Sequence, residues 1–114
     1  MRFTALYWWI DRWRKSTAFT DLTLEEQGAY RNLLDEATLR GGPLPNDQRV
    51  LAKASVDATR WAKVKTKVMK RFVLRSDGWH NETLDGVLLE STRRATNQAN
   101  YRKRLKANGR ITGR

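Results

Sequence analysis

The chain has 114 residues, which is enough for one domain with an appendage but too few for two independent hydrophobic cores. Its 23 Lys and Arg residues outnumber 12 Asp and Glu residues, and the formal net charge of +11 favours an anionic partner such as nucleic acid, an anionic membrane or an acidic protein. The absence of cysteine excludes disulfides, thiolate metal sites and a cysteine nucleophile, and the single histidine, His80, gives little basis for a metal site. We therefore expect neither a cofactor nor a bound metal.

The N-terminal stretch "ALYWWIDRW", residues 5–13, is rich in aromatic side chains. It does not resemble a signal peptide, because the apolar run from Phe3 is broken by Thr4, ends at Asp11 and has no small-residue cleavage site. No run in the chain approaches the roughly 20 apolar residues that a membrane-spanning helix needs. We therefore expect a soluble, cytoplasmic protein with no membrane partner.

Alternating residues in this stretch predict a strand near residues 4–10, with Trp8 and Ile10 on its buried side. Aromatic side chains among cations can also stack on unpaired bases, and Tyr7 and Trp9 on the opposite side are the candidates for such a surface role. We favour packing in a small hydrophobic core for most of the stretch.

The sequence "TLEE" predicts the start of a first helix, because Thr23 and Glu26 have the spacing of a capping box. Gly41, Gly42 and Pro43 predict its end. The apolar stripe that follows the helical period consists of Tyr30, Leu33, Leu34 and Ala37.

Two shorter helices are predicted next. Asn46 is the expected N-cap of the second helix, and Asp57 is the expected N-cap of the third, where Val56 and Trp61 have the spacing of a hydrophobic staple. The side chains of the second helix that should face the core are Val50, Leu51 and Ala54. The last two of the three helices resemble a helix-turn-helix pair.

The run "FVLRSDGWHN" predicts a β-hairpin with its turn at Asp77-Gly78 and with Arg75 near its tip. An isolated hairpin is marginally stable, so a third strand is expected, and the N-terminal aromatic strand is the candidate.

From about Leu84 the chain again has a helical pattern, with Val87 and Leu88 also facing inward. Beyond residue 90 the apolar stripe is lost. We therefore divide the chain into a domain over residues 1–90 and a basic extension over residues 91–114, which is either a solvated helix or a tail that orders on a partner. The final residues, "NGRITGR", are expected to be disordered.

The positive charge is concentrated in two blocks. Residues 1–57 hold eight basic and eight acidic side chains, whereas residues 58–75 hold seven basic and no acidic ones. Residues 76–90 hold four acidic side chains, and residues 91–114 hold eight basic and no acidic ones. Each basic block therefore requires its own explanation.

The first block predicts a DNA-binding surface. Four cations of the third helix recur at helical spacing on an acid-free face, beside the apolar stripe of Trp61, Val64 and Val68, and they are Arg60, Lys63, Lys67 and Lys70. In winged-helix domains such a helix enters the major groove and the hairpin contacts the phosphate backbone, which gives Arg75 a role on the wing. The alternative is a solvated helix face.

The second block predicts neutralisation of the DNA backbone or insertion into a minor groove. Its candidate residues are Arg93, Arg94, Arg102, Lys103, Arg104 and Lys106. Such cations have no base-reading signature, since they bind phosphate regardless of sequence, and the alternative is an interaction tail for an acidic protein.

Several motifs together resemble a known family. They are "YWWIDRW", "LTLEEQGAYRNLLDEA", "GGPLPNDQRVLAKAS", "RWAKVKTKVMKRF" and "DGWHNETLDGVLLE", and they are similar to small phage and prophage domains of the YdaU family, of the DUF1376 type, over about residues 7–90. The resemblance implies a winged-helix-like fold and a role in phage or prophage DNA replication, often beside a helicase loader. The motif residues Gly28, Tyr30, Pro43 and Pro45 resemble architectural positions, so the resemblance implies no catalytic residue.

The expected fold class is therefore α+β and mostly α: a winged helix with a three-helix core, a hairpin wing, an N-terminal strand and a basic C-terminal helix or tail. The expected function is binding of double-stranded DNA at a replication origin, without enzymatic activity and with a helicase loader or another replication protein as a further partner. A protein-interaction adaptor or inhibitor and a transcriptional regulator are the alternatives. No heptad seam is strong enough to assert a homodimer, which stays open.

Overall fold

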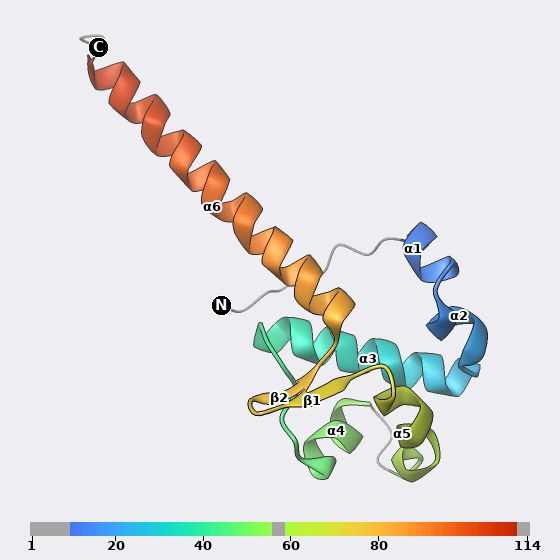
Figure 1. Cartoon of the computed structure of the whole chain (residues 1–114). Coiled ribbons are helices and arrows are strands. Elements are labelled where there is room, and N and C mark those ends of the chain that lie inside the picture. The colour runs from blue at the N-terminus through green and yellow to red at the C-terminus, as the bar shows by residue number, and fades with distance from the viewer. Residues whose placement is uncertain (1–9, 56–58, 112–114) are drawn as a thin grey trace.

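The structure is a computed structural model that describes residues 10–55 and 59–111, with side chains up to residue 108. The described chain is mostly helical with one two-stranded antiparallel sheet, which confirms the mostly helical α+β class (Figure 1). The elements in chain order are α1 (Ile10–Arg14), α2 (Thr17–Asp21), α3 (Leu24–Arg40), α4 (Gln48–Ala54), α5 (Trp61–Met69), β1 (Val73–Arg75), β2 (Gly78–His80) and α6 (Glu82–Ile111). None of these helices combines the length and the apolarity needed to span a membrane.

The structure tests the predicted N-terminal strand only at its last residue, Ile10. Most of the strand predicted near residues 4–10, including Tyr7 and Trp9, lies outside the described residues. Ile10, the last residue of that strand, was expected to be buried. It is instead the first residue of α1, and it is 69% exposed, so this part of the prediction was wrong.

The central helix α3 forms as its sequence predicts. The backbone N–H of Glu26 donates to the Thr23 hydroxyl at 3.2 Å, and the Thr23 N–H donates to the Glu26 carboxylate at 2.9 Å, so the capping box is complete. Gly41 ends the helix in the left-handed region at φ 72°, where glycine has no steric penalty. The predicted apolar stripe is buried, as shown by the low exposure of Tyr30, Leu33, Leu34 and Ala37.

Helix α4 begins one residue later than predicted. Asp47 is its N-cap, and its carboxylate accepts from the backbone N–H of Arg49 at 2.9 Å. The Asn46 amide oxygen instead accepts from the Trp79 indole N–H at 3.3 Å. Leu51 is fully buried as predicted.

Helix α5 begins at Trp61 and follows Arg60, whose side chain makes no capping hydrogen bond. The predicted cap and staple residues, Asp57 and Val56, lie outside the described residues. The predicted inward face is confirmed, since Trp61, Val64 and Val68 are all buried.

The hairpin forms, but its turn is shifted by one residue. Arg75 pairs with Gly78, so the two turn residues are Ser76 and Asp77 rather than Asp77 and Gly78. Gly78 has φ 132°, and a Cβ atom at this position would lie 2.3 Å from the Leu44 carbonyl oxygen. Only glycine therefore allows the backbone of the hairpin to approach Leu44 this closely.

The residue that pairs with the hairpin from outside the two-stranded sheet comes from an unexpected segment. Leu44 forms an antiparallel bridge with Trp79, with N–H to carbonyl distances of 2.9 and 2.7 Å in the two directions. In the described chain this residue, between α3 and α4, takes the place that we assigned to the N-terminal aromatic strand.

In the part of the chain that the structure describes, helix α6 contacts the rest of the molecule through its first turns. Asn81 precedes the helix, accepts from the Leu84 N–H at 2.9 Å, and donates to the Tyr30 hydroxyl at 3.0 Å and the Arg71 carbonyl at 3.1 Å. Leu84 and Leu88 are buried, but the side chains from residue 93 to residue 108 are all exposed.

Its 30 residues correspond to a length of about 45 Å, and the helix extends away from the body (Figure 1). It crosses residue 90 without a break and continues to Ile111, into the stretch that we expected to be disordered.

Candidate nucleic-acid interface

The first basic surface lies on α5, on the side opposite its buried stripe. We call it the α5 surface, and it consists of Arg60, Lys63, Lys67 and Lys70, all of which are exposed. The helix is shorter than predicted, so Arg60 and Lys70 flank it as N-cap and C-cap. The four cations nevertheless remain next to one another along one short element.

This surface is not acid-free, as the linear sequence suggested. Helix α3 brings Glu25 between the first two cations, with its carboxylate oxygens 3.7 Å from an Arg60 guanidinium nitrogen and 3.7 Å from the Lys63 ammonium. These residues are 35 and 38 positions from Glu25, and the packing of α3 against α5 brings them together. Lys67 and Lys70 form no ion pair with any acidic side chain that the structure describes.

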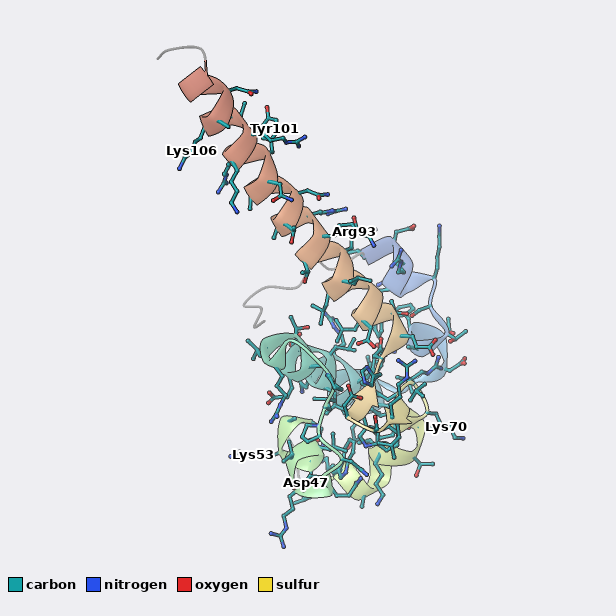
Figure 2. The ribbon with its side chains drawn as sticks, turned by 60° about the vertical axis from the view of Figure 1, so that its left-hand side comes forward. Asp47, Lys53, Lys70, Arg93, Tyr101 and Lys106 are labelled. Carbon is teal, nitrogen blue, oxygen red and sulfur yellow. The ribbon has the colours of Figure 1, made fainter. Side chains whose placement is uncertain are left out.

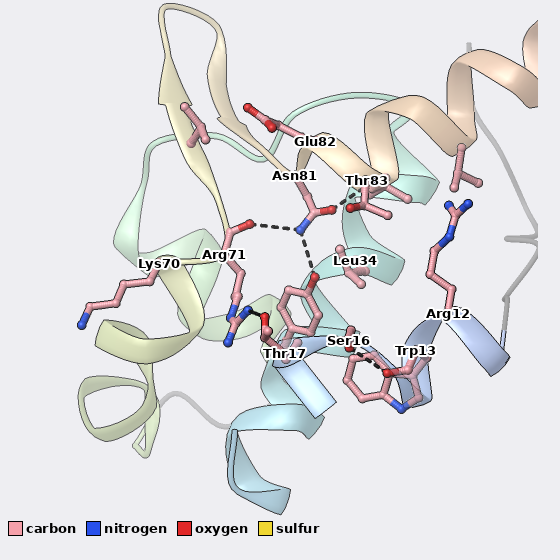
Figure 3. A pocket seen from close by; sticks show the side chains of 15 residues that line it. Arg12, Trp13, Ser16, Thr17, Leu34, Lys70, Arg71, Asn81, Glu82 and Thr83 are labelled. Carbon is pink, nitrogen blue, oxygen red and sulfur yellow. Dashed lines mark hydrogen bonds between the residues drawn. The ribbon is translucent and has the colours of Figure 1, made fainter. Parts of the chain in front are cut away.

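Arg75 lies at the last residue pair before the hairpin turn, as predicted. Its guanidinium is 3.6 Å from the Glu82 carboxylate at the start of α6. The hairpin turn points away from α5 in the views of Figures 1 and 3. The structure therefore does not place Arg75 beside the α5 surface.

The second basic surface lies on α6 over residues 91–108, which we call distal α6, and its side chains from residue 93 are exposed. Its six cations are all exposed, and they are Arg93, Arg94, Arg102, Lys103, Arg104 and Lys106. Glu90 lies 3.7 Å from Arg93 and 3.4 Å from Arg94, whereas the other four cations pair with no acidic side chain in the described chain.

The structure does not bring the two surfaces together. Figure 2 shows Lys70 on the body and Lys106 near the far end of α6. The molecule is 66 Å long, so the two basic blocks occupy separate parts of it.

The structure also contains a cleft that the sequence did not reveal. It has a volume of about 440 Å³ and lies where α1, α2 and α3 meet the end of α5 and the start of α6 (Figure 3). The Trp13 ring stacks on Tyr30 with centroids 6.1 Å apart, and Leu34, Leu84 and Val87 add further apolar walls.

Polar side chains tie the walls of the cleft together. Arg71 donates to the Thr17 hydroxyl and lies 3.5 Å from the Asp21 carboxylate, so α2 is held against the end of α5. Burial raises the pKa of Tyr30, against the lowering effects of the Asn81 hydrogen bond and the nearby Arg71 charge. Arg12 and Lys70 also line the cleft.

A charged cluster connects the hairpin to α6. His80 contacts the Asp77 carboxylate through Nε2 and the Asp85 carboxylate through Nδ1, each at 2.7 Å. The hydrogen bond to Asp77, followed by that to Asp85, raises the pKa of His80, and the His80 hydrogen bond lowers the pKa of Asp77. Among the residues that the structure describes, no group of three or more His, Asp and Glu could hold a metal ion.

These observations define a small, mostly helical α+β domain with two separate cationic surfaces and a long projecting helix. The chain belongs to the family described as "Protein of unknown function (DUF1376)", whose model matches residues 8–88. This confirms the DUF1376 assignment that the resemblance implied. No curated protein and no solved structure matches the chain.

Proposed function

We propose that the protein binds double-stranded DNA through a winged-helix-like domain and its projecting basic helix. The order of elements supports this architecture: α3 is followed by the short pairing segment at Leu44, by the helix pair α4 and α5, and by the β1–β2 hairpin. In a winged helix the second helix of such a pair faces the DNA, and here that helix is α5.

The observation that carries the proposal is the position of the positive charge. Distal α6 has 18 residues without a single acidic side chain, and its cations are exposed on a helix with no other visible role in the described structure. Lysine and arginine side chains that neutralise phosphates release condensed counterions, so such a surface binds duplex DNA with strong salt dependence. The α5 surface adds Lys67 and Lys70 as further contacts.

The proposed biological role rests on the family resemblance. Similarity to YdaU-type phage and prophage proteins supports a function in replication initiation or replisome organisation at an origin, in the cytoplasm of a bacterial host. A helicase loader or another replication protein is then the expected protein partner. Transcriptional regulation uses the same fold and the same contacts, and it differs in the location of the DNA site.

The first test is fluorescence anisotropy of the full chain with a labelled random duplex at two salt concentrations. Lys63→Glu combined with Lys67→Glu should weaken binding by about 10-fold or more and reduce the salt slope by about 0.9 for each phosphate contact that is lost. The melting temperature should change little, because both side chains are exposed.

The matched control, Arg40→Glu combined with Lys53→Glu, changes the net charge equally on residues outside both surfaces. It should have a much smaller effect on binding. Equal affinity of the α5 variant and the wild type would remove the α5 surface from the proposal, and no binding by the wild type would reject DNA binding itself.

A second candidate function, as a protein-interaction module, rests on the cleft. Its apolar walls fit an apolar side chain, and Arg12 and Lys70 favour carboxylates beside that side chain in the partner segment. A replication protein retained by the full chain after nuclease treatment and moderate salt would support it. Val87→Glu inside the cleft should abolish that retention, and Leu105→Glu on distal α6 should leave it unchanged.

A further inference from the structure

We infer that distal α6 reads bases in the major groove of DNA through a stripe of four residues: Arg93, Asn97, Asn100 and Arg104. This inference rests on the proposed function and deepens it, because it assigns base recognition to a particular element. In this arrangement α6 recognises the bases, and the lysines of the α5 surface contact the phosphates.

The first support is the helical position of these residues. They follow one another at spacings of four, three and four, so at about 100° per residue they fall within a sector of about 60° on one side of the helix. The structure is helical through the whole segment, and all four side chains are exposed. Asn108, four residues further on, continues the same stripe.

The second support is the chemistry of the stripe. Arginine bonds in a bidentate manner to the O6 and N7 atoms of guanine, and asparagine bonds in the same manner to the N6 and N7 atoms of adenine. The α5 surface is different, because three of its four cations are lysines, which act as point charges and bind phosphate without regard to sequence. Amide side chains contribute nothing to electrostatic attraction, so their position between arginines favours recognition over simple neutralisation.

The third support is the position of the neighbouring cations. Arg94 and Lys103 lie about 90° to either side of the stripe, where the two phosphate backbones flank a helix seated in a groove. The major groove is about 12 Å wide and admits one α-helix. The deep, narrow major groove of double-stranded RNA does not admit it, so the occupant that fits this surface is duplex DNA.

The test is selection by the full chain from a library of duplexes with a randomised core of about 20 base pairs. We expect an enriched motif that contains both G·C and A·T positions and binds at least 10-fold more tightly than random duplex. Asn97→Ala combined with Asn100→Ala should reduce that preference about 10-fold or more, with the affinity for random duplex nearly unchanged. Alanine is the best helix former, so circular dichroism should show an intact α6.

The control substitutions lie on the two flanks of the stripe, on the same helix. Arg94→Gln combined with Lys103→Gln should lower the affinity for every duplex and reduce the salt slope, and it should leave the preferred motif unchanged. This pattern separates base reading from general attraction.

The outcomes are distinguishable. Binding without an enriched motif, or a motif that the asparagine variant still prefers, overturns the inference and leaves DNA binding intact. No binding to any duplex rejects the proposed function together with the inference. A dimer in sedimentation experiments that Tyr101→Ala dissociates would show that a second copy occupies distal α6, and this result also overturns the inference.

Discussion

Helices α3 and α6 are the two longest helices of the molecule, and different forces hold them. Helix α3 has a complete capping box, a left-handed glycine at its end and a buried stripe in contact with α4, α5 and α6. Among the described residues, helix α6 is packed through its first turns, and its side chains from residue 93 to residue 108 are exposed. Packing fixes the identity of the α3 side chains, whereas the distal α6 side chains are available to a partner. Substitutions can test this contrast.

The largest expected effect is on the core stripe of α3. Leu33 is fully buried, so Leu33→Ala should lower the free energy of unfolding by about 3 kcal/mol through lost burial and the cavity that remains. Leu105→Ala makes the same chemical change on distal α6, where the side chain is 52% exposed, and it should change stability by less than about 0.5 kcal/mol. Urea unfolding of both variants measures the difference. Equal losses would show that distal α6 is packed in solution.

The next largest effect on stability is expected at Asn81, where the start of α6 is bonded to the rest of the domain. Asn81→Ala removes the bond to the Leu84 N–H at the helix start and leaves the Arg71 carbonyl without its side-chain donor, so unfolding should become easier by about 2 kcal/mol. Asn100→Ala removes the same side chain from an exposed position and should have almost no effect on stability. Equal melting temperatures for the two variants would show that the Asn81 side chain does not stabilise the packing of α6 against the rest of the domain.

A smaller effect is expected on DNA affinity when the acid of the α5 surface is removed. Glu25→Gln removes the negative charge beside Arg60 and Lys63, so the affinity for random duplex should increase several-fold and the salt slope should become steeper by about one. Glu36→Gln is the control, because it breaks the ion pair to Arg40 on the same helix at a similar exposure. An unchanged affinity for the Glu25 variant would mean that these two cations do not contact DNA.

The smallest expected effect is the pH dependence of the histidine cluster. The pKa of His80 is raised in the folded state, so its contribution to stability is complete below its ordinary value of 6.5 and is lost as the pH rises through the raised pKa. The pKa of Asp77 is lowered, so its contribution is present above its ordinary value of 3.8 and is lost as the pH falls through the lowered pKa. The difference in melting temperature between the wild type and His80→Gln should therefore be larger at about pH 5 than at about pH 9. A difference that grows toward alkaline pH would contradict the assigned contacts.

Sequence patterns within a few residues were sufficient to predict the elements that depend only on neighbouring residues. The capping box at Thr23, the stop at Gly41 and the stripe around Leu33 depend on spacings of three and four, and the structure contains all of them. The family, too, was recognisable from the sequence, because its motifs are short and continuous.

The misplaced features depend on contacts between distant segments. Asn46 was the predicted helix cap, but in the structure its amide oxygen accepts a hydrogen bond from the indole N–H of Trp79, 33 positions away. Glu25 reaches the α5 surface through the packing of α3 against α5, and the cleft has walls from four helices, the end of α5 and the hairpin. For distal α6 the sequence left a solvated helix and a tail as alternatives, and its arginines and asparagines share one side only because the structure is helical there.

The most direct test of the central claim is residue-by-residue NMR of the full chain during titration with a random duplex. The proposal predicts amide shift changes on the α5 surface and along distal α6, at residues 93–106, which diminish as salt is added. The buried side of α3 should be unaffected. Changes confined to the cleft, or no changes at any salt concentration, would contradict DNA binding through these two surfaces.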